Sequence, residues 1–296
     1  MRSNIHEYAL IAPPTLAAAL ATLASDPGLY TPIAGGTELM VALSAGRLAQ
    51  KNLLSINHLA ELRFIEVTRE SVVIGSGTTF TDIRKHPVIA SDFPLLVQAA
   101  SWTGSIANQN RGTLGGNIVN ASPAADSPPA LLAYDAVLTL ISVAGIRTLL
   151  YRDFHLDYKK TALRPDELLY SIRLERRYTG YISYARKVGT RNAQAISKIA
   201  LACVARMAPD PSNRAIRQIQ DIRIGAASLR ETPTRCIATE QALLSQPIDA
   251  DTIAVARAAL ATEARPIDDI RSTAKYRAAV AANLLEEFLR TLHAAP

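Results

Sequence analysis

The pattern of hydrophobic and polar positions changes near the middle of the chain. In the first part, short apolar runs alternate with glycine-containing turns and Ala/Leu-rich stretches. From about residue 178, the apolar runs are longer and polar turns separate them, which is typical of an antiparallel sheet. Strands and helices follow in mixed order rather than in regular alternation, so we expect an α+β fold.

This pattern predicts a specific set of elements. The predicted strands are residues 53–56, 64–67, 71–75, 137–143, 168–174, 181–187, 199–207 and 216–227, with a further strand directly after a turn at Gly145. The predicted helices are residues 15–23, 95–102, 127–135, 253–264 and 273–292, with Thr15, Ser127 and Ser272 as N-caps of the first, third and last. We expect a first domain over residues 1–176, built from two α/β lobes (about 1–57 and 58–176). Residues 177–296 are expected to form a C-terminal domain with a three-stranded antiparallel sheet and helices.

Two glycine pairs carry the clearest chemical signal. Gly35-Gly36 and Gly115-Gly116 can take φ > 0 and present N–H groups that no side chain covers. Short polar residues surround both pairs and can reach phosphate or ribose oxygens: Thr37, Glu38, Thr113, Asn117, Asn120 and Ser122. Two such loops predict a diphosphate held from both sides, and hence a dinucleotide. The usual G-x-G-x-x-G fingerprint is absent.

Charge and cysteine content narrow the function classes. The net charge of +6 comes from scattered Lys and Arg residues without interleaved aromatics, so we expect no nucleic-acid binding. Cys203 and Cys236 match no zinc motif and are too few for an iron–sulfur cluster, which needs about four cysteines, so any cluster belongs to another chain. No signal-peptide pattern and no apolar run of roughly 20 residues is present, so we expect a cytoplasmic protein without a transmembrane segment.

Several motifs together resemble a known family. Ala34-Gly-Gly-Thr-Glu38, and Thr113-Leu-Gly-Gly-Asn117 followed by Ala121-Ser-Pro-Ala-Ala-Asp126, resemble the two FAD-binding signatures of molybdenum hydroxylase flavoprotein subunits. That family includes the corresponding subunits of xanthine dehydrogenase and carbon monoxide dehydrogenase. Residues 154–174, 226–243 and 269–277 resemble, in order, its further segments. The resemblance implies a two-lobed, PCMH/vanillyl-alcohol-oxidase-like FAD-binding domain followed by the family's C-terminal domain.

The resemblance also implies a site for noncovalent FAD. The residues expected at its pyrophosphate are Gly35, Gly36, Thr37, Thr113, Gly115, Gly116 and Asn117, with Ile33 and Ala34 leading the chain into that contact. Asp126 would hydrogen-bond ribityl or ribose hydroxyls. Lys187 would lie near the flavin ring, where a cation stabilises a reduced anionic flavin. Leu169 or Tyr170 would lie against the isoalloxazine.

Two positions depart from the family pattern. Glu38 replaces the more usual aspartate, and Gln109 stands where arginine is usual. The change at Gln109 calls into question any ion pair to the diphosphate or to a partner at that point. The scattered histidines predict neither metal ligation nor covalent flavin attachment.

The implied function is electron transfer within a complex. The expected partners are a small subunit with [2Fe-2S] clusters and a large subunit with the molybdopterin cofactor, and NAD, a quinone or oxygen would accept the electrons. No residue of this chain is expected to act as a catalytic acid or base, because the cofactor carries the redox chemistry. Two alternatives stay open. A self-contained FAD-dependent oxidoreductase would need a base near the flavin, for which the motifs offer no candidate. A non-enzymatic scaffold would not need the intact glycines.

Overall fold

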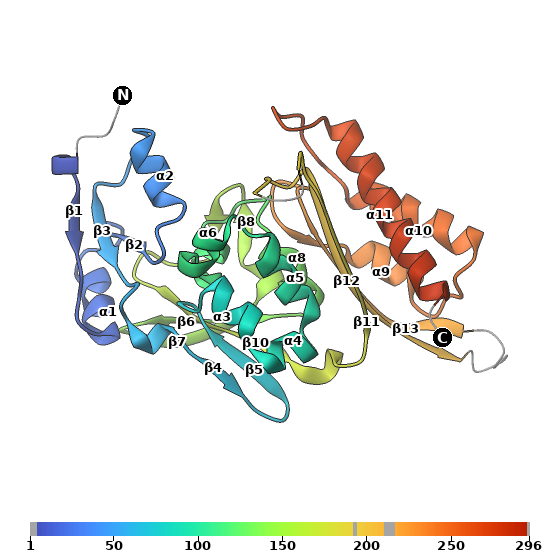
Figure 1. The fold of residues 1–296 in the computed structure, drawn as a ribbon, viewed down its shortest axis with the longest axis horizontal. Helices are drawn as coiled ribbons and strands as arrows, with labels where there is room; N and C mark the ends of the chain where they lie inside the picture. The colour runs from blue at the N-terminus through green and yellow to red at the C-terminus, as the bar shows by residue number, and fades with distance from the viewer. Residues whose placement is uncertain (1–4, 192–193, 210–216, 295–296) are drawn as a thin grey trace.

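The N-terminal part of the chain forms a parallel sheet of three strands. The computed structural model describes residues 5–191, 194–209 and 217–294 (Figure 1). The strands of this first sheet, in the order β1-β3-β2, are β1 (Ala9–Ile11), β2 (Thr31–Ile33) and β3 (Asn52–Ser55). Its helices are α1 (Leu16–Ser25) and α2 (Leu39–Ser44). The hydroxyl of Thr15 accepts a hydrogen bond from the Ala18 N–H (3.1 Å), so the predicted cap is confirmed.

An antiparallel sheet of five strands follows in the order β4-β5-β10-β6-β7. Its strands are β4 (Ile65–Val67), β5 (Ser71–Gly75), β6 (Val137–Ser142), β7 (Gly145–Leu150) and β10 (Leu168–Glu175), and a separate hairpin joins β8 (His155–Asp157) to β9 (Lys160–Thr161). The helices of this region are α3 (Phe80–Lys85), α4 (Pro87–Asp92), α5 (Pro94–Trp102), α6 (Ile106–Arg111), α7 (Leu114–Val119) and α8 (Ser127–Ala133). Short 3-10 helices lie at Ile5–Glu7, Ala60–Leu62, Tyr151–Asp153 and Arg176–Tyr178.

The C-terminal sheet has one strand more than predicted. Its strands are β11 (Ile182–Val188), β12 (Ile199–Pro209), β13 (Arg217–Ala227) and the two-residue β14 (Thr234–Arg235), all antiparallel. The helices are α9 (Ile237–Leu243), α10 (Ala250–Glu263) and α11 (Ala274–Ala294), and they lie on the side of the sheet away from α5 and α8 (Figure 1). The sequence did not predict β14 because two residues carry no period-2 pattern. The sequence also predicts a polar turn at residues 209–213, between the strands predicted at 199–207 and 216–227, and this turn falls almost wholly outside the described residues.

Strand β12 is buried on both faces and joins two cores. Ala202 and Val204 pack into the core of the central region, whereas Leu201 and Cys203 pack against the C-terminal helices. Alternate side chains of a strand point to opposite faces, so a strand covered on both sides reads as one continuous apolar run. The C-terminal sheet therefore forms one wall of the central core.

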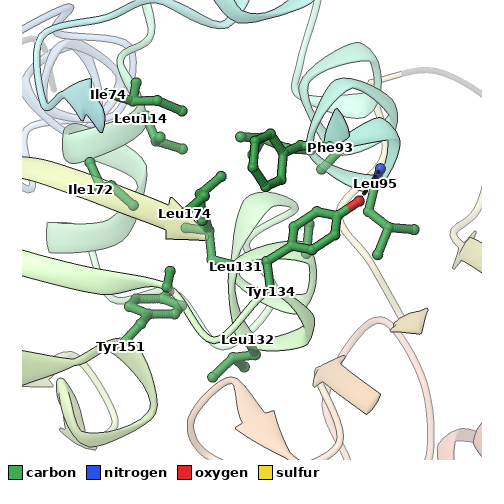
Figure 2. Packing of buried hydrophobic residues seen from close by; sticks show 14 of the residues in the cluster. Ile74, Phe93, Leu95, Leu114, Leu131, Leu132, Tyr134, Tyr151, Ile172 and Leu174 are labelled. Carbon is green, nitrogen blue, oxygen red and sulfur yellow. Dashed lines mark hydrogen bonds between the residues drawn. The ribbon is translucent and has the colours of Figure 1, made fainter. Parts of the chain in front are cut away.

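Tyr134 shows how that central core satisfies a polar group. Its ring packs edge-on against Phe93 with centroids 5.2 Å apart, and its hydroxyl accepts a hydrogen bond from the Leu95 N–H (3.1 Å) (Figure 2). That N–H lies in the first turn of α5, where helices leave amide groups without internal partners. The Tyr134 hydroxyl thus gives an amide at the start of α5 a partner, while the ring contributes buried apolar area.

Two predicted helix caps are wrong. Ser127 is the first residue of α8 rather than its cap, and its hydroxyl donates to Asn117 Oδ1 (2.6 Å). Thr273 rather than Ser272 caps α11, since the Tyr276 N–H donates to the Thr273 hydroxyl (3.2 Å). In both places two neighbouring residues can cap, and tertiary contacts decide which one does. None of the helices in the described part of the chain is both long and apolar enough to cross a membrane.

Candidate flavin site

The two glycine loops come close together at Gly35. A methyl group on Gly35 would lie 1.8 Å from the backbone oxygen of Arg111, the last residue of α6, so the first loop packs against the backbone directly before the second loop. The next residue, Gly36, has φ +73°, a backbone conformation that residues other than glycine rarely adopt. The positive φ that the sequence predicts is therefore confirmed at Gly36, whereas Gly35 has no positive φ and is required by its close packing against Arg111. Such a backbone fits a ligand that must approach main-chain atoms, as a diphosphate does.

The second loop differs from the prediction. Gly115 and Gly116 lie in the first turn of α7, and neither has a positive φ. The Gly115 N–H donates to the Ser76 carbonyl (2.9 Å), and the Gly116 N–H donates to the Thr113 hydroxyl (3.0 Å). The expectation of positive φ and uncovered amides at this pair is therefore wrong, because Thr113 caps a helix and Ser76 accepts the next amide.

Gly115 is required for packing rather than for conformational freedom. A methyl group on it would lie 2.5 Å from Ser76 Cβ and 2.7 Å from the Ser76 carbonyl oxygen. Ser76 in turn donates its N–H to the Tyr170 carbonyl (2.9 Å). The segment Gly75–Gly77, which the sequence indicates only as a turn, therefore ties α7 to strand β10.

The other polar residues of the second loop already have protein partners. Asn117 accepts from Ser127, and the Ser122 hydroxyl accepts from the Ala124 N–H (3.3 Å). Asn120, the C-cap of α7, accepts through its carbonyl and its Oδ1 from the ammonium of Lys159. These bonds fix the orientation of each amide or hydroxyl.

Asp126 and Lys187 form an ion pair. The Lys187 ammonium lies 2.8 Å from Asp126 Oδ1, and the two side chains are 9% and 12% exposed. The Ser197 hydroxyl also donates to Asp126 Oδ1 (3.2 Å), and Lys187 donates to the Trp102 carbonyl (3.3 Å). Burial raises the pKa of Asp126, and the Lys187 charge partly offsets that shift. Two residues that the family resemblance assigned separately thus belong to one charged unit.

Leu169 and Tyr170 occupy different surroundings. Leu169 is only 4% exposed and packs within the central core, so it has little surface to offer a ligand. Tyr170 is partly buried, and its ring packs against Phe64 with centroids 5.6 Å apart. Both remain predicted flavin contacts.

Gln109 has a structural role at its unusual position. It is 2% exposed, and its amide oxygen accepts from Arg84 of α3 (2.5 Å) while its amide nitrogen donates to the Ser101 carbonyl (3.1 Å). A guanidinium from another helix therefore lies beside the position where the family usually has arginine. The neighbouring Arg111 is exposed.

A partly buried histidine, His155, begins the hairpin that carries Lys159. His155 Nε2 shares a hydrogen bond with the Tyr151 hydroxyl (2.9 Å), and its buried Nδ1 has no hydrogen-bond partner among the residues that the structure describes. Burial lowers the pKa of His155 from 6.5 to about 4. Adding a proton to this ring would place a charge where only a neutral ring is accommodated.

Acid should therefore destabilise the chain through His155. The unfolded chain binds this proton near pH 6.5 and the folded chain only near pH 4, so the stabilising contribution is complete above that window and is lost as pH falls through it. We expect a loss of roughly 2 kcal/mol between about pH 7 and about pH 5. Urea unfolding at both values should detect it, and the His155→Gln variant should lose less over the same interval. An equal loss in both proteins would refute this assignment.

Comparison with known proteins identifies the family of the chain. The model of the FAD binding domain in molybdopterin dehydrogenase matches residues 6–175, and the model of the CO dehydrogenase flavoprotein C-terminal domain matches residues 184–292. The chain is 30% identical over 265 residues to the putative xanthine dehydrogenase FAD-binding subunit of Escherichia coli, covering 89% of this chain and 88% of that protein. It is 28% identical to the glyceraldehyde dehydrogenase medium chain of Sulfolobus acidocaldarius (83% and 84% covered).

A solved structure extends the likeness to the fold. Carbon monoxide dehydrogenase from Hydrogenophaga pseudoflava, in a form that lacks the Mo-pyranopterin moiety of its molybdenum cofactor, superposes with a TM-score of 0.89. The two chains are 27% identical, and the match covers 95% of each. The predicted family and α+β fold are thereby confirmed. This chain belongs to the family of FAD-binding subunits of molybdopterin-dependent dehydrogenases, and it is an oxidoreductase subunit.

Proposed function

We propose that FAD binds where the two glycine loops meet, and that the chain transfers electrons within a molybdenum-containing dehydrogenase complex. The observation that carries the proposal is the backbone contact of Gly35 with Arg111, beside Gly36 in a left-handed conformation. A side chain at Gly35 would destroy this contact, and bare backbone is what a diphosphate needs. The proposed domains are residues 1–176, in two lobes of about 1–57 and 58–176, and residues 177–296.

The predicted site residues of the two loops have proposed roles. Ile33 ends β2 and, with Ala34, leads into the first loop, while Thr37 and Glu38 precede α2. In the second loop, Thr113 fixes the start of α7, and Gly115 lets this helix pack against Ser76. Gly116, which is exposed, would leave room for the cofactor, and Asn117, Asn120 and Ser122 would offer oriented polar groups to it.

The buried pair of Asp126 and Lys187 would serve the flavin end of the site. Ser127, the residue after Asp126, donates to Asn117, so the pair lies directly behind the second loop. When bound, FAD supplies a redox centre that exchanges electrons one or two at a time. Lys187 would hold positive charge near the ring, and Asp126 would keep that ammonium oriented while accepting from hydroxyl groups of the cofactor.

The partners follow from the family. We propose a small [2Fe-2S] subunit as electron donor and a large molybdopterin subunit as the site of substrate oxidation, with NAD, a quinone or oxygen as acceptor. The relatives are named for xanthine, glyceraldehyde and carbon monoxide, yet their chains align along most of this one. Because relatives named for such different substrates share this chain, we propose that substrate specificity resides in another subunit.

Affinity purification of the tagged chain from its own cells tests this function. We expect FAD, iron and molybdenum to co-purify, and substrate of the complex to bleach the flavin absorbance. Removal of the iron–sulfur subunit should stop that bleaching while FAD stays bound. Oxidation of an organic substrate by the isolated chain would instead favour a self-contained oxidoreductase. A chain that lacks flavin in every preparation would overturn the proposal.

A further inference from the structure

Lys159 occupies an unusual position at the tip of the β8–β9 hairpin. Its backbone has φ +57°, in the left-handed region that non-glycine residues enter at an energetic cost. The turn directs its ammonium to Asn120, whose carbonyl and Oδ1 accept hydrogen bonds of 2.8 and 2.9 Å. Strained backbone of this kind persists at ligand-binding positions more often than elsewhere.

The charge of Lys159 lacks a bound counter-ion. Within the part of the chain that the structure describes, no carboxylate lies within ion-pair distance of its ammonium, whereas the adjacent Lys160 pairs with Asp157 at 3.0 Å. The residue as a whole is exposed, but burial of the ammonium lowers the pKa of Lys159, and the nearby Glu38 carboxylate acts in the opposite direction. A partly desolvated cation without a counter-ion is suited to receive an anion.

Lys159 is placed between the two loops of the proposed flavin site. It hydrogen-bonds Asn120 at the end of α7, the helix of the second loop, and it interacts electrostatically with Glu38 of the first. Glu38 would repel a diphosphate unless a cation offsets its charge. An ammonium has three donors, and two of them are used by Asn120, so one is left for a further oxygen.

We propose that Lys159 is an additional FAD-binding residue, which contributes its charge and its third donor to the diphosphate. This inference rests on the proposed flavin site. It adds a residue that neither glycine loop contains, supplied by a hairpin some forty residues after the second loop. The neutral His155, which begins the same hairpin, would help to hold the turn in position.

The Lys159→Gly variant tests this role, because glycine keeps the φ of the turn without strain. FAD affinity of the flavin-free full chain, measured by fluorescence quenching, should fall about tenfold, the loss expected for one hydrogen bond to a charged group. The melting temperature of the flavin-free variant should equal or exceed that of the wild type. Lys160→Ala is the matched control, since it removes a neighbouring cation that is already paired, and it should keep wild-type affinity.

Salt dependence supplies a second measurement. A contact between Lys159 and the diphosphate is screened by salt, so FAD affinity of the wild type should depend on ionic strength more steeply than that of Lys159→Gly. Unchanged FAD affinity in Lys159→Gly would overturn the inference. So would an affinity loss that accompanies a lower melting temperature, because Lys159 would then serve only the fold. If the wild-type chain and its complex both lack FAD, the proposed function itself fails.

Discussion

The Gly35→Ala variant is expected to purify without flavin. The added methyl would lie 1.8 Å from the Arg111 oxygen and 2.5 Å from the Arg111 carbonyl carbon, so the first loop must move away from the second. A displacement of about 1 Å in a positioned site costs on the order of 100-fold, and FAD affinity should fall by at least that factor. The ratio of flavin to protein absorbance, followed by titration with FAD, measures the effect.

Gly180→Ala is the matched control for that substitution. Gly180 has a positive φ of +82°, which Gly35 does not, and a methyl group there would meet nothing within 4 Å. It should therefore cost about 1 kcal/mol of stability and leave the flavin content unchanged. Wild-type FAD affinity in Gly35→Ala would show that contact between the loops is not needed for the cofactor.

The second large effect concerns Lys187. We expect Lys187→Met to lower the reduction potential of the bound flavin by about 30 mV, which for a two-electron couple corresponds to about 1.4 kcal/mol. The reason is that the lost cation would have stabilised the negative charge of the reduced ring. Anaerobic titration against a redox dye measures the potential. An unchanged potential would place the Lys187 ammonium away from the flavin.

The same substitution should destabilise the fold in a pH-dependent way. It leaves Asp126 buried without its counter-ion, and breaking such a pair costs about 3–5 kcal/mol. The pKa of Asp126 is already raised by burial, so the folded state takes up its proton more readily than the unfolded state does. The penalty should therefore shrink as pH falls and the carboxyl becomes neutral.

A double variant separates the two roles of Lys187. In Asp126→Asn/Lys187→Met neither buried charge remains, so most of the stability should return, because removing both partners costs less than leaving one unpaired. The flavin potential should stay low, since the cation is still absent. A potential that recovers together with stability would mean that the first effect came from misfolding.

Much of the fold follows from the hydrophobic periodicity of the sequence and from the turn residues that bound each apolar run. Strands such as β5 and β12 lie within two residues of their predicted ends, because apolar runs bounded by turn residues leave few alternatives. Short helices were harder to predict. Helix α6 spans six largely polar residues, and its sequence shows no apolar face of helical period.

The second glycine loop shows where local reasoning failed. Gly115 and Gly116 are poor helix formers, so their propensity favours a loop over a helix. Helix α7 forms because Thr113 caps it and because position 115 holds glycine, since a side chain there would clash with Ser76. Ser76 belongs to a segment almost forty residues earlier in the chain. No local pattern encodes that contact.

The charged part of the site depends on distant partners as well. Helix α8 and strands β6 to β10 lie between Asp126 and Lys187 in the chain, so no spacing rule links the two residues, and only family resemblance singled them out. Lys159 was not predicted at all. Its surroundings in sequence are those of an ordinary exposed turn, and its significance comes from Asn120 and Glu38, which the fold brings near it.

A crystal structure of the chain with FAD tests the central claim most directly. Density for the diphosphate should lie against residues 34–38 and 113–117 together, with the isoalloxazine toward Lys187. A diphosphate that contacts only one of the two loops, or FAD bound elsewhere on the molecule, would contradict the two-loop site.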